Sequence, residues 1–200
     1  MIQQGTPEWL ALRAGKVTGS RIADVLAKGS GVTRGKYIDQ LVTERLTKDI
    51  QEGYTNAAMQ RGTEMEPVAR SMYSFHTGSH VEQIAFVEHP QIAMSGASPD
   101  GLVGEDGMVE FKCPNSETHI GYIMAGKPPA KYIPQMAWQL ACTGRKWVDF
   151  CSFDDRLTDE SKHLFIIRYE RDNEYIAEIE EKVKEFLLEV EAKVEKFNSL

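Results

Sequence analysis

One stretch of the chain predicts the architecture of the rest: residues 98–113, which read SPDGLVGEDGMVEFKC. Two short runs of alternating apolar and polar residues flank a Glu-Asp-Gly sequence, a pattern that predicts a β-hairpin. With residues 105–107 as a three-residue loop, Asp100 would pair with Lys112 across the hairpin. Because side chains alternate between the faces of a strand, this register places Val103, Val109 and Phe111 on one face. The other face carries Asp100, Glu110 and Lys112, with Leu102 as its apolar member.

That polar face has two interpretations. It could be a solvated surface that carries these residues by chance, or it could be a reaction centre. Carboxylates on neighbouring strands, a lysine two residues after a glutamate and no evident Ser–His or Cys–His set favour metal-assisted hydrolysis. Asp100, Glu110 and the backbone carbonyl of Phe111 supply the hard oxygen ligands that Mg²⁺ prefers, for one or two ions. Lys112 would orient or deprotonate the attacking water, or neutralise charge on the phosphate.

Composition limits the protein class. A chain of 200 residues suits one domain, so residues 1–200 are expected to form a single unit. The apolar runs are too short for a membrane span, and the N-terminal sequence lacks a signal-peptide pattern. Three cysteines without paired spacing favour a reducing cytoplasm. The net charge of −7 argues mildly against a nucleic-acid partner, although a bound cation would offset the carboxylates.

The N-terminal third offers candidate anion sites. Thr6 and Pro7 predict a helix start, and Arg13 lies in its last turn, where it either complements the helix dipole or binds a phosphate. A second helix is expected to open at residues 17–20, and its free N–H groups suit a phosphate, although simple capping by Ser20 explains the same pattern. Residues 28–36 read as a basic, glycine-containing loop.

A helix is predicted over residues 37–46, with a break around Gly53. Another helix is predicted from residue 55 or 56 to residues 73–75, with Pro67 kinking or restarting it. Glu64 and Glu66 lie two positions apart and therefore point to different sides, so only one of them can face the core. On these grounds Glu66 remains an ordinary exposed glutamate.

The rest of the chain alternates strands and helices. Strands are expected at 81–88, 92–95, 147–153 and 163–169, with a helix at 131–143 and a C-terminal amphipathic helix within 172–200. Gln135 and Gln139 lie four apart on the helix at 131–143, so they form one polar stripe that faces either solvent or something specific. The order predicts an α/β (or α+β) fold, with a mixed central sheet and helices on both faces.

The sequence also resembles a known family. Residues 98–100 with 110–112 match the PD-(D/E)xK signature of a nuclease superfamily. Further matches follow the same order as in the lambda-exonuclease-like viral recombinases: Glu8-Trp9-Leu10, Arg13, Gly15, Thr18, Ser20, Gly62, Glu66, Cys113-Pro114, Tyr132 and Gln135. The resemblance covers about residues 5–175 and implies a restriction-endonuclease-like core.

This resemblance implies roles for individual residues. Glu66, Asp100 and Glu110 correspond to metal ligands, Lys112 to the catalytic lysine and Gln135 to a glutamine that supports the site. A pocket for a 5′-terminal phosphate is implied at three further residues, Arg13, Ser20 and Ser98. Two more DNA contacts are implied, an apolar wedge at Met59 and a minor-groove contact at Arg34. The loop at 28–36 is shorter than in the phage enzyme, and Arg61 replaces an aromatic residue.

The family's activity is Mg²⁺-dependent 5′→3′ digestion of one strand of duplex DNA, with two ions per site and Mn²⁺ as a substitute. The products are 5′-mononucleotides and a 3′ single strand. The resemblance further implies a ring-shaped homotrimer, a single-strand annealing protein as partner, and a phage or prophage gene expressed in the bacterial host cytoplasm. Two alternatives stay open: an endonuclease of the same superfamily, and a non-catalytic protein that binds DNA ends.

Overall fold

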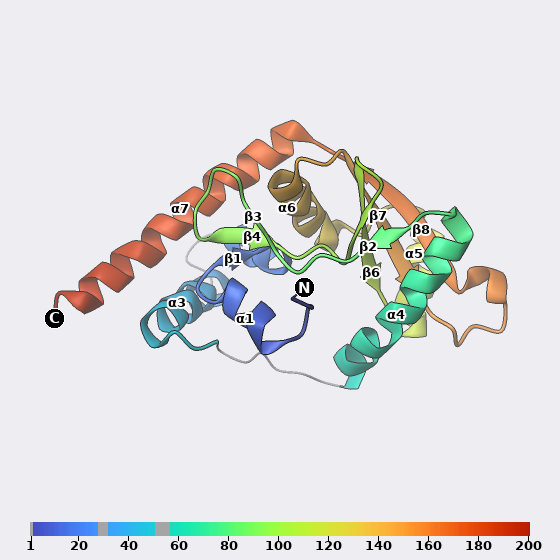
Figure 1. Ribbon diagram of the computed structural model, residues 1–200, viewed down its shortest axis with the longest axis horizontal. Helices are drawn as coiled ribbons and strands as arrows, with labels where there is room; N and C mark the ends of the chain where they lie inside the picture. The colour runs from blue at the N-terminus through green and yellow to red at the C-terminus, as the bar shows by residue number, and fades with distance from the viewer. Residues whose placement is uncertain (1, 28–31, 51–56) are drawn as a thin grey trace.

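The computed structural model describes residues 2–27, 32–50 and 57–200. Its centre is a five-stranded mixed sheet in the order β2-β5-β6-β7-β8, in which only β6 and β7 run parallel (Figure 1). The strands of this sheet are β2 (Val81–Glu82), β5 (Gly101–Val103), β6 (Gly107–Lys112), β7 (Trp147–Phe153) and β8 (Leu164–Glu170). The main helices are α1 (Pro7–Arg13), α3 (Val32–Thr47), α4 (Ala57–Thr77), α5 (Ser116–Ala125), α6 (Ile133–Thr143) and α7 (Asn173–Asn198).

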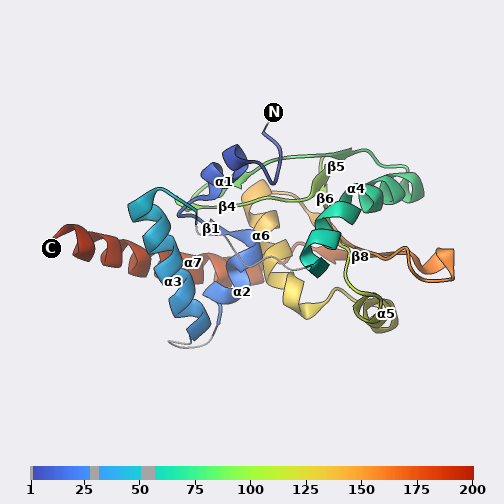
Figure 2. The same cartoon turned by 90° about the horizontal axis from the view of Figure 1, so that it is seen from below.

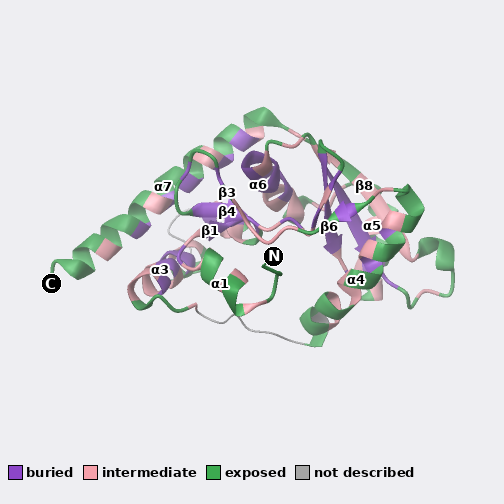
Figure 3. Cartoon of the chain, in the orientation of Figure 1, coloured by how far each residue is buried: buried purple, intermediate pink, exposed green. Residues whose placement is uncertain are grey.

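Helices cover both faces of the sheet, as the sequence predicts (Figure 2). Met108 and Phe150 belong to the buried cluster that includes α6 and α7. Val109 and Phe111 face the other way and pack with Tyr73 of α4, whose ring meets that of Phe111 edge-on at 5.9 Å. The central strands are consequently buried on both sides (Figure 3).

The hairpin forms, but its predicted register is wrong. Val103 pairs with Gly107, two residues earlier than expected, so the loop is 104–106. Gly104 takes the positive φ that the turn requires, 56°. Gly107 instead lies in β6, where a Cβ atom would come within 2.1 Å of the Trp147 ring. Because the shift is an even number of residues, each side chain keeps its predicted face.

The predicted strand at 81–88 is two strands in different sheets. Val81–Glu82 forms β2 at the edge of the main sheet, whereas Val87–Glu88 forms β3 in a second sheet of order β1-β4-β3. This small sheet also contains β1 (Val17–Thr18) and β4 (Ser95–Ala97). The chain crosses between the sheets at Phe86, whose ring lies against Gly96, a position with no room for a side chain.

Some predicted helix boundaries also change. The helix expected to open at 17–20 is a strand followed by the short turn η1 (Gly19–Arg21) and the helix α2 (Ile22–Val25). In the basic segment 28–36, helix α3 already begins at Val32, and residues 28–31 lie outside the described part. Pro67 lies inside α4, which does not restart there. Across the described residues, no helix is long and apolar enough to cross a membrane.

Replacing Tyr73 with phenylalanine is expected to lower the free energy of unfolding by about 1.5 kcal/mol. The Tyr73 hydroxyl donates to Oδ2 of buried Asp149 at 2.8 Å, and this bond ties α4 to β7. Arg168 also binds Asp149, through two bonds of 2.8 and 3.0 Å, so the carboxylate keeps its cationic partner in the variant. Urea unfolding measures the change, and an unchanged midpoint would show that Arg168 alone satisfies Asp149.

Candidate active site

Glu110 is fully buried on β6, on the face covered by α6, and its carboxylate accepts three hydrogen bonds. The Lys112 ammonium and the Gln135 amide nitrogen, the latter at 2.5 Å, both donate to Oε1. The Gln139 amide nitrogen donates to Oε2 at 2.6 Å. Strand alternation puts Glu110 and Lys112 on one face, and helical spacing puts both glutamines on the facing side of α6. The structure therefore brings together Glu110, Lys112 and Gln135, as predicted.

Asp100 immediately precedes β5 and lies across the hairpin from Glu110. Its Oδ2 accepts a hydrogen bond of 2.7 Å from the backbone N–H of Phe111. Burial, together with the negative charge of Glu110, raises the pKa of Asp100 well above its ordinary value, and Lys112 only partly opposes this. The carboxyl of Asp100 is thus close enough to Glu110 for its pKa to respond to the charge of Glu110. A role for the Phe111 carbonyl as a metal ligand stays a prediction.

Lys112 keeps its proton in this arrangement. Burial by itself would lower the pKa of the ammonium, but the attraction of Glu110 and Asp100 outweighs burial and raises it above the ordinary value. The ammonium also lies 5.2 Å from the centre of the Tyr132 ring. Of the roles predicted for Lys112, orientation of a water and neutralisation of phosphate charge suit this protonated state.

Glu66, rather than Glu64, is the helix glutamate that faces the site. Glu64 is exposed, whereas Glu66 is half-buried and forms an ion pair with Arg70 one helical turn later. Burial raises the pKa of Glu66, and among the charged groups that affect this pKa are Arg70, Glu110 and Lys112. Glu66 is thus close enough to Glu110 and Lys112 for their charges to affect its pKa, although its carboxylate is paired with Arg70.

The donor set suits a hard divalent cation. Asp100 and Glu110 repel each other when both are charged, and a cation would offset that repulsion. The side-chain oxygen of Gln139 is also buried and has no hydrogen-bond partner among the described residues. Over the same residues, no three His, Cys, Asp or Glu side chains are arranged to hold one metal ion. Two oxygen donors, Asp100 and Glu110, nevertheless fit a hard divalent cation by their chemistry, and Glu66 as a third ligand stays a prediction.

The N-terminal segment is bonded to the loop that carries Asp100. The Trp9 indole N–H donates to the hydroxyl of Ser98 at 3.0 Å, and the Gln4 amide donates to the Pro99 carbonyl at 2.8 Å. The Arg13 guanidinium stacks on Trp9, 3.9 Å from the ring centre. Arg13 and Ser98 are thus connected through Trp9, which places the predicted phosphate residues at the edge of the acidic site.

A cavity of about 1280 Å³ opens beside this segment, and both Arg13 and Ser20 line it. Its wall contains six basic and three acidic side chains, in a protein whose overall charge is −7: Arg13, Lys16, Arg21, Lys36, Arg45 and Lys48 against Asp39, Glu44 and Asp49. Ser20 follows Gly19, where a Cβ atom would lie 3.9 Å from Cγ of Gln135. Ser20 of the cavity wall is thus next in sequence to a residue that packs near α6, and the excess of basic side chains in the wall favours an anion.

Comparison with known families identifies the family of this chain. Residues 8–146 match the YqaJ-like viral recombinase domain. The chain belongs to that family. No match is found among curated proteins.

Three solved structures are similar to this YqaJ-like protein over nearly its whole length. An alkaline exonuclease, LHK-Exo, from Laribacter hongkongensis is 51% identical over 97% of both chains, with a TM-score of 0.91. The same enzyme in complex with dAMP gives 52% identity, 97% coverage of both chains and a TM-score of 0.92. A phage related exonuclease from Haemophilus somnus 129PT shares 16% identity over 94% of this chain and 99% of its own (TM-score 0.68), which supports the fold alone. The YqaJ-like chain is therefore a nuclease with the PD-(D/E)xK fold, similar to alkaline exonuclease.

The two other predicted DNA contacts, Arg34 and Met59, do not line the basic cavity. Arg34, on α3 of the YqaJ-like chain, forms two hydrogen bonds with Glu189 of α7, at 2.6 and 2.9 Å. Met59 is 54% exposed near the start of α4, and its carbonyl accepts a bond from Thr63 at 3.3 Å. The structure therefore places Arg34 at the contact between two helices and Met59 at the surface, and their roles on DNA stay predictions.

Two contributors to the site were missed from the sequence. Gln139 binds Glu110, and its spacing of four from Gln135 was the available signal, although no role was assigned to it. Arg70 binds Glu66, also at a spacing of four, but an Arg one turn after a Glu is common on exposed helices.

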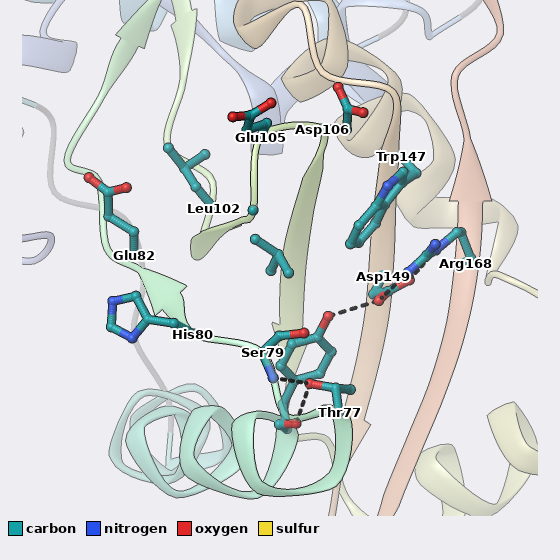
Figure 4. A pocket seen from close by; sticks show the side chains of 13 residues that line it. Thr77, Ser79, His80, Glu82, Leu102, Glu105, Asp106, Trp147, Asp149 and Arg168 are labelled. Carbon is teal, nitrogen blue, oxygen red and sulfur yellow. Dashed lines mark hydrogen bonds and ion pairs between the residues drawn. The ribbon is translucent and has the colours of Figure 1, made fainter.

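A second cavity, of about 830 Å³, lies away from this chemistry between the end of α4 and the far face of the sheet (Figure 4). Tyr73, Asp149 and Arg168 line it, together with Trp147, over which the Arg168 guanidinium stacks at 3.5 Å. None of the predicted site residues lines this second cavity. Asp149 binds both Arg168 and Tyr73, so this part of the cavity wall is a structural network.

Proposed function

We propose that this YqaJ-like nuclease is a Mg²⁺-dependent 5′→3′ exonuclease that digests one strand of linear duplex DNA. It releases 5′-mononucleotides and leaves a 3′ overhang for recombination by strand annealing. The observation that carries the proposal is the Asp100–Glu110–Lys112 cluster together with its link to the basic cavity, since Arg13 of the cavity wall stacks on Trp9, and Trp9 binds Ser98 of the Asp100 loop. The relative solved with dAMP supports a mononucleotide product.

Each group has a chemical role in this proposal. Asp100 and Glu110 would hold the cation, with Glu66 as a further ligand. A divalent cation bound there would polarise the phosphodiester and lower the pKa of an attacking water. The Lys112 ammonium, held against Glu110, places positive charge where charge develops on the phosphate. Gln135 would hold Oε1 of Glu110 in place through its amide nitrogen. The Lys112 ammonium has three protons and donates one of them to Glu110, so it has others to donate to the phosphate.

In this proposal, the basic cavity sets the direction in which the DNA strand is digested. A terminal 5′-phosphate carries more negative charge than an internal phosphodiester, so the basic wall of the cavity would bind it in preference. Lys16, Arg21 and Arg45 already form ion pairs with acidic side chains, which leaves Arg13, Lys36 and Lys48 as the proposed phosphate ligands. A strand anchored there by its end enters the acidic site with a fixed polarity. Ser98, which accepts a bond from Trp9, would hold the Asp100 loop against this anchor.

The deciding experiment compares linear duplex DNA with closed circular DNA, in Mg²⁺ and in Mn²⁺, with EDTA as the blank. We expect digestion of the linear substrate alone and release of 5′-mononucleotides. Equal cutting of circular DNA would support the endonuclease alternative. Retention of DNA ends without release of nucleotides would support a binding protein.

Arg13→Ala is expected to lower the preference for 5′-phosphorylated over 5′-hydroxyl ends by about tenfold or more, because a charge-assisted hydrogen bond contributes about 1.5–3 kcal/mol. The measurement is the ratio of initial rates on the two ends. Lys182→Ala, an exposed position on α7, changes the net charge equally and should leave the ratio unchanged. A ratio unaffected by Arg13→Ala would remove this residue from the proposed phosphate pocket.

The proposal includes an assembly. By family resemblance, three copies form a ring around the duplex in the host cytoplasm, and a single-strand annealing protein receives the 3′ strand. Light scattering should then give three times the chain mass of 22.5 kDa. A monomer mass at micromolar concentration would contradict the ring but leave the chemistry of the site intact.

A further inference from the structure

Gln139 is a buried amide in the interior of α6, and its contacts set it apart from its neighbours. Its side chain is 1% exposed, between the fully buried Trp138 and Leu140. Its amide nitrogen donates to Oε2 of Glu110 at 2.6 Å, whereas Lys112 and Gln135 both donate to Oε1. Within the described residues, Gln139 is therefore the one side chain that holds Oε2.

The amide orientation is set by chemistry. An ionised carboxylate can only accept hydrogen bonds, so the nitrogen of Gln139 must face Glu110 and the oxygen must point elsewhere. That oxygen is buried and unpartnered among the described residues. A buried carbonyl without a donor costs about 1–3 kcal/mol, so an apolar residue would serve packing better here. Stability alone does not account for a glutamine at this position.

The hydrogen bond from Gln139 restricts the rotation of the Glu110 carboxylate plane. The last torsion of a glutamate side chain is broad, so donors on one oxygen leave the carboxylate free to rotate. With Gln135 on Oε1 and Gln139 on Oε2, both oxygens are anchored to the same helix. The Glu110 carboxylate is thereby held in one orientation, with Oε1 next to Lys112.

We propose that Gln139 is a positioning residue that fixes the Glu110 carboxylate for cation binding, so that the metal site is preorganised rather than assembled on binding. This inference deepens the proposed function and rests on it for the identity of the cation. Hydrogen bonds to metal ligands from neighbouring residues typically change cation affinity or activity by about 10–100-fold.

Two variants test it. Gln139→Met keeps the length of the side chain and removes both polar atoms, whereas Gln139→Glu keeps the shape and replaces the donor by an acceptor. The control is Leu140→Met, a conservative change to the next buried residue of α6 that does not touch Glu110. For each protein, Mn²⁺ affinity is measured by calorimetric titration without DNA, together with thermal stability and the kcat and KM for linear duplex DNA.

We expect Gln139→Met to weaken Mn²⁺ binding and lower kcat by about 10–100-fold each. The KM for DNA and the melting temperature should stay close to those of the wild type, because removal of the unpartnered oxygen offsets the lost hydrogen bond. Gln139→Glu should weaken Mn²⁺ binding further or abolish kcat, and Leu140→Met should match the wild type throughout.

Unchanged Mn²⁺ affinity and kcat in Gln139→Met would overturn the inference, as would a loss of folding in Gln139→Met and Gln139→Glu alike, which would indicate a purely structural role. The two proposals can fail separately. A wild type whose Mn²⁺ affinity depends on Gln139 but which never degrades DNA would refute the nuclease function alone. A nuclease whose Mn²⁺ affinity and kcat are unchanged by Gln139→Met would refute this inference alone.

Discussion

Lys112→Met is expected to reduce digestion of linear duplex DNA by at least about a hundredfold and to destabilise the folded chain by about 3 kcal/mol. Both effects have the same origin. The Glu110 side chain is 1% exposed and Lys112 is its cationic partner, so the variant leaves a buried carboxylate with two neutral amide donors. The charge that would neutralise the phosphate is lost in the same step.

Digestion rates at saturating Mg²⁺ and urea unfolding in EDTA measure the two effects. Lys146→Met is the matched control, because that lysine is 69% exposed in its pair with Asp106, and exposed pairs contribute about 0–1 kcal/mol. Added Mg²⁺ should restore part of the stability lost in Lys112→Met, since a cation offsets the charge of Glu110. Full activity in Lys112→Met would remove Lys112 from the mechanism.

Asp100→Asn is expected to abolish digestion while raising the free energy of unfolding by about 1–2 kcal/mol in EDTA at pH 8. Burial and the negative charge of Glu110 raise the pKa of Asp100 and so disfavour its charged form, whereas an asparagine oxygen can still accept the N–H of Phe111 without carrying charge. Function and stability therefore make opposite demands on this position. A less stable Asp100→Asn protein would contradict the electrostatic explanation.

The raised pKa of Asp100 predicts how the free energy of unfolding depends on pH. A carboxyl whose pKa is raised by folding binds its proton more tightly in the folded state, so the wild type loses stability as pH rises from the unfolded pKa through the raised folded one. Asp100→Asn should lack this decline. Unfolding in EDTA across that interval measures it, with Asp106→Asn, at an exposed position, as the control.

The sequence predicted the faces of the central hairpin but not its register. Alternation of apolar and polar residues is a local property, and it placed Glu110 and Lys112 correctly on one side. The register depends on which glycine lies in the turn, and Gly104 and Gly107 are both suited to one. The choice is decided by Trp147, which packs on Gly107 from a strand much later in the chain. That contact has no local signature.

The site residues also divide into those that a local sequence pattern predicts and those whose contacts depend on long-range packing. Asp100, Glu110, Lys112 and Gln135 could be predicted because they follow one motif and one helix period. The partner of Arg34 could not, since Glu189 lies 155 positions later and the pair depends on how α3 packs on α7. An arginine in a basic segment has the same composition whether it binds DNA or a neighbouring helix.

The bonds between the N-terminal segment and the Asp100 loop have a consequence for biosynthesis. Trp9 and Ser98 are 89 positions apart, and Gln4 and Pro99 are 95 apart, so these contacts close very long stretches of chain. Contacts of such separation form slowly, because the entropy of loop closure precedes any stabilisation. A chain still emerging from the ribosome must also wait for Gln135 and Gln139 of α6. An incomplete chain therefore lacks an assembled site, which would shield the DNA of the cell that makes the enzyme.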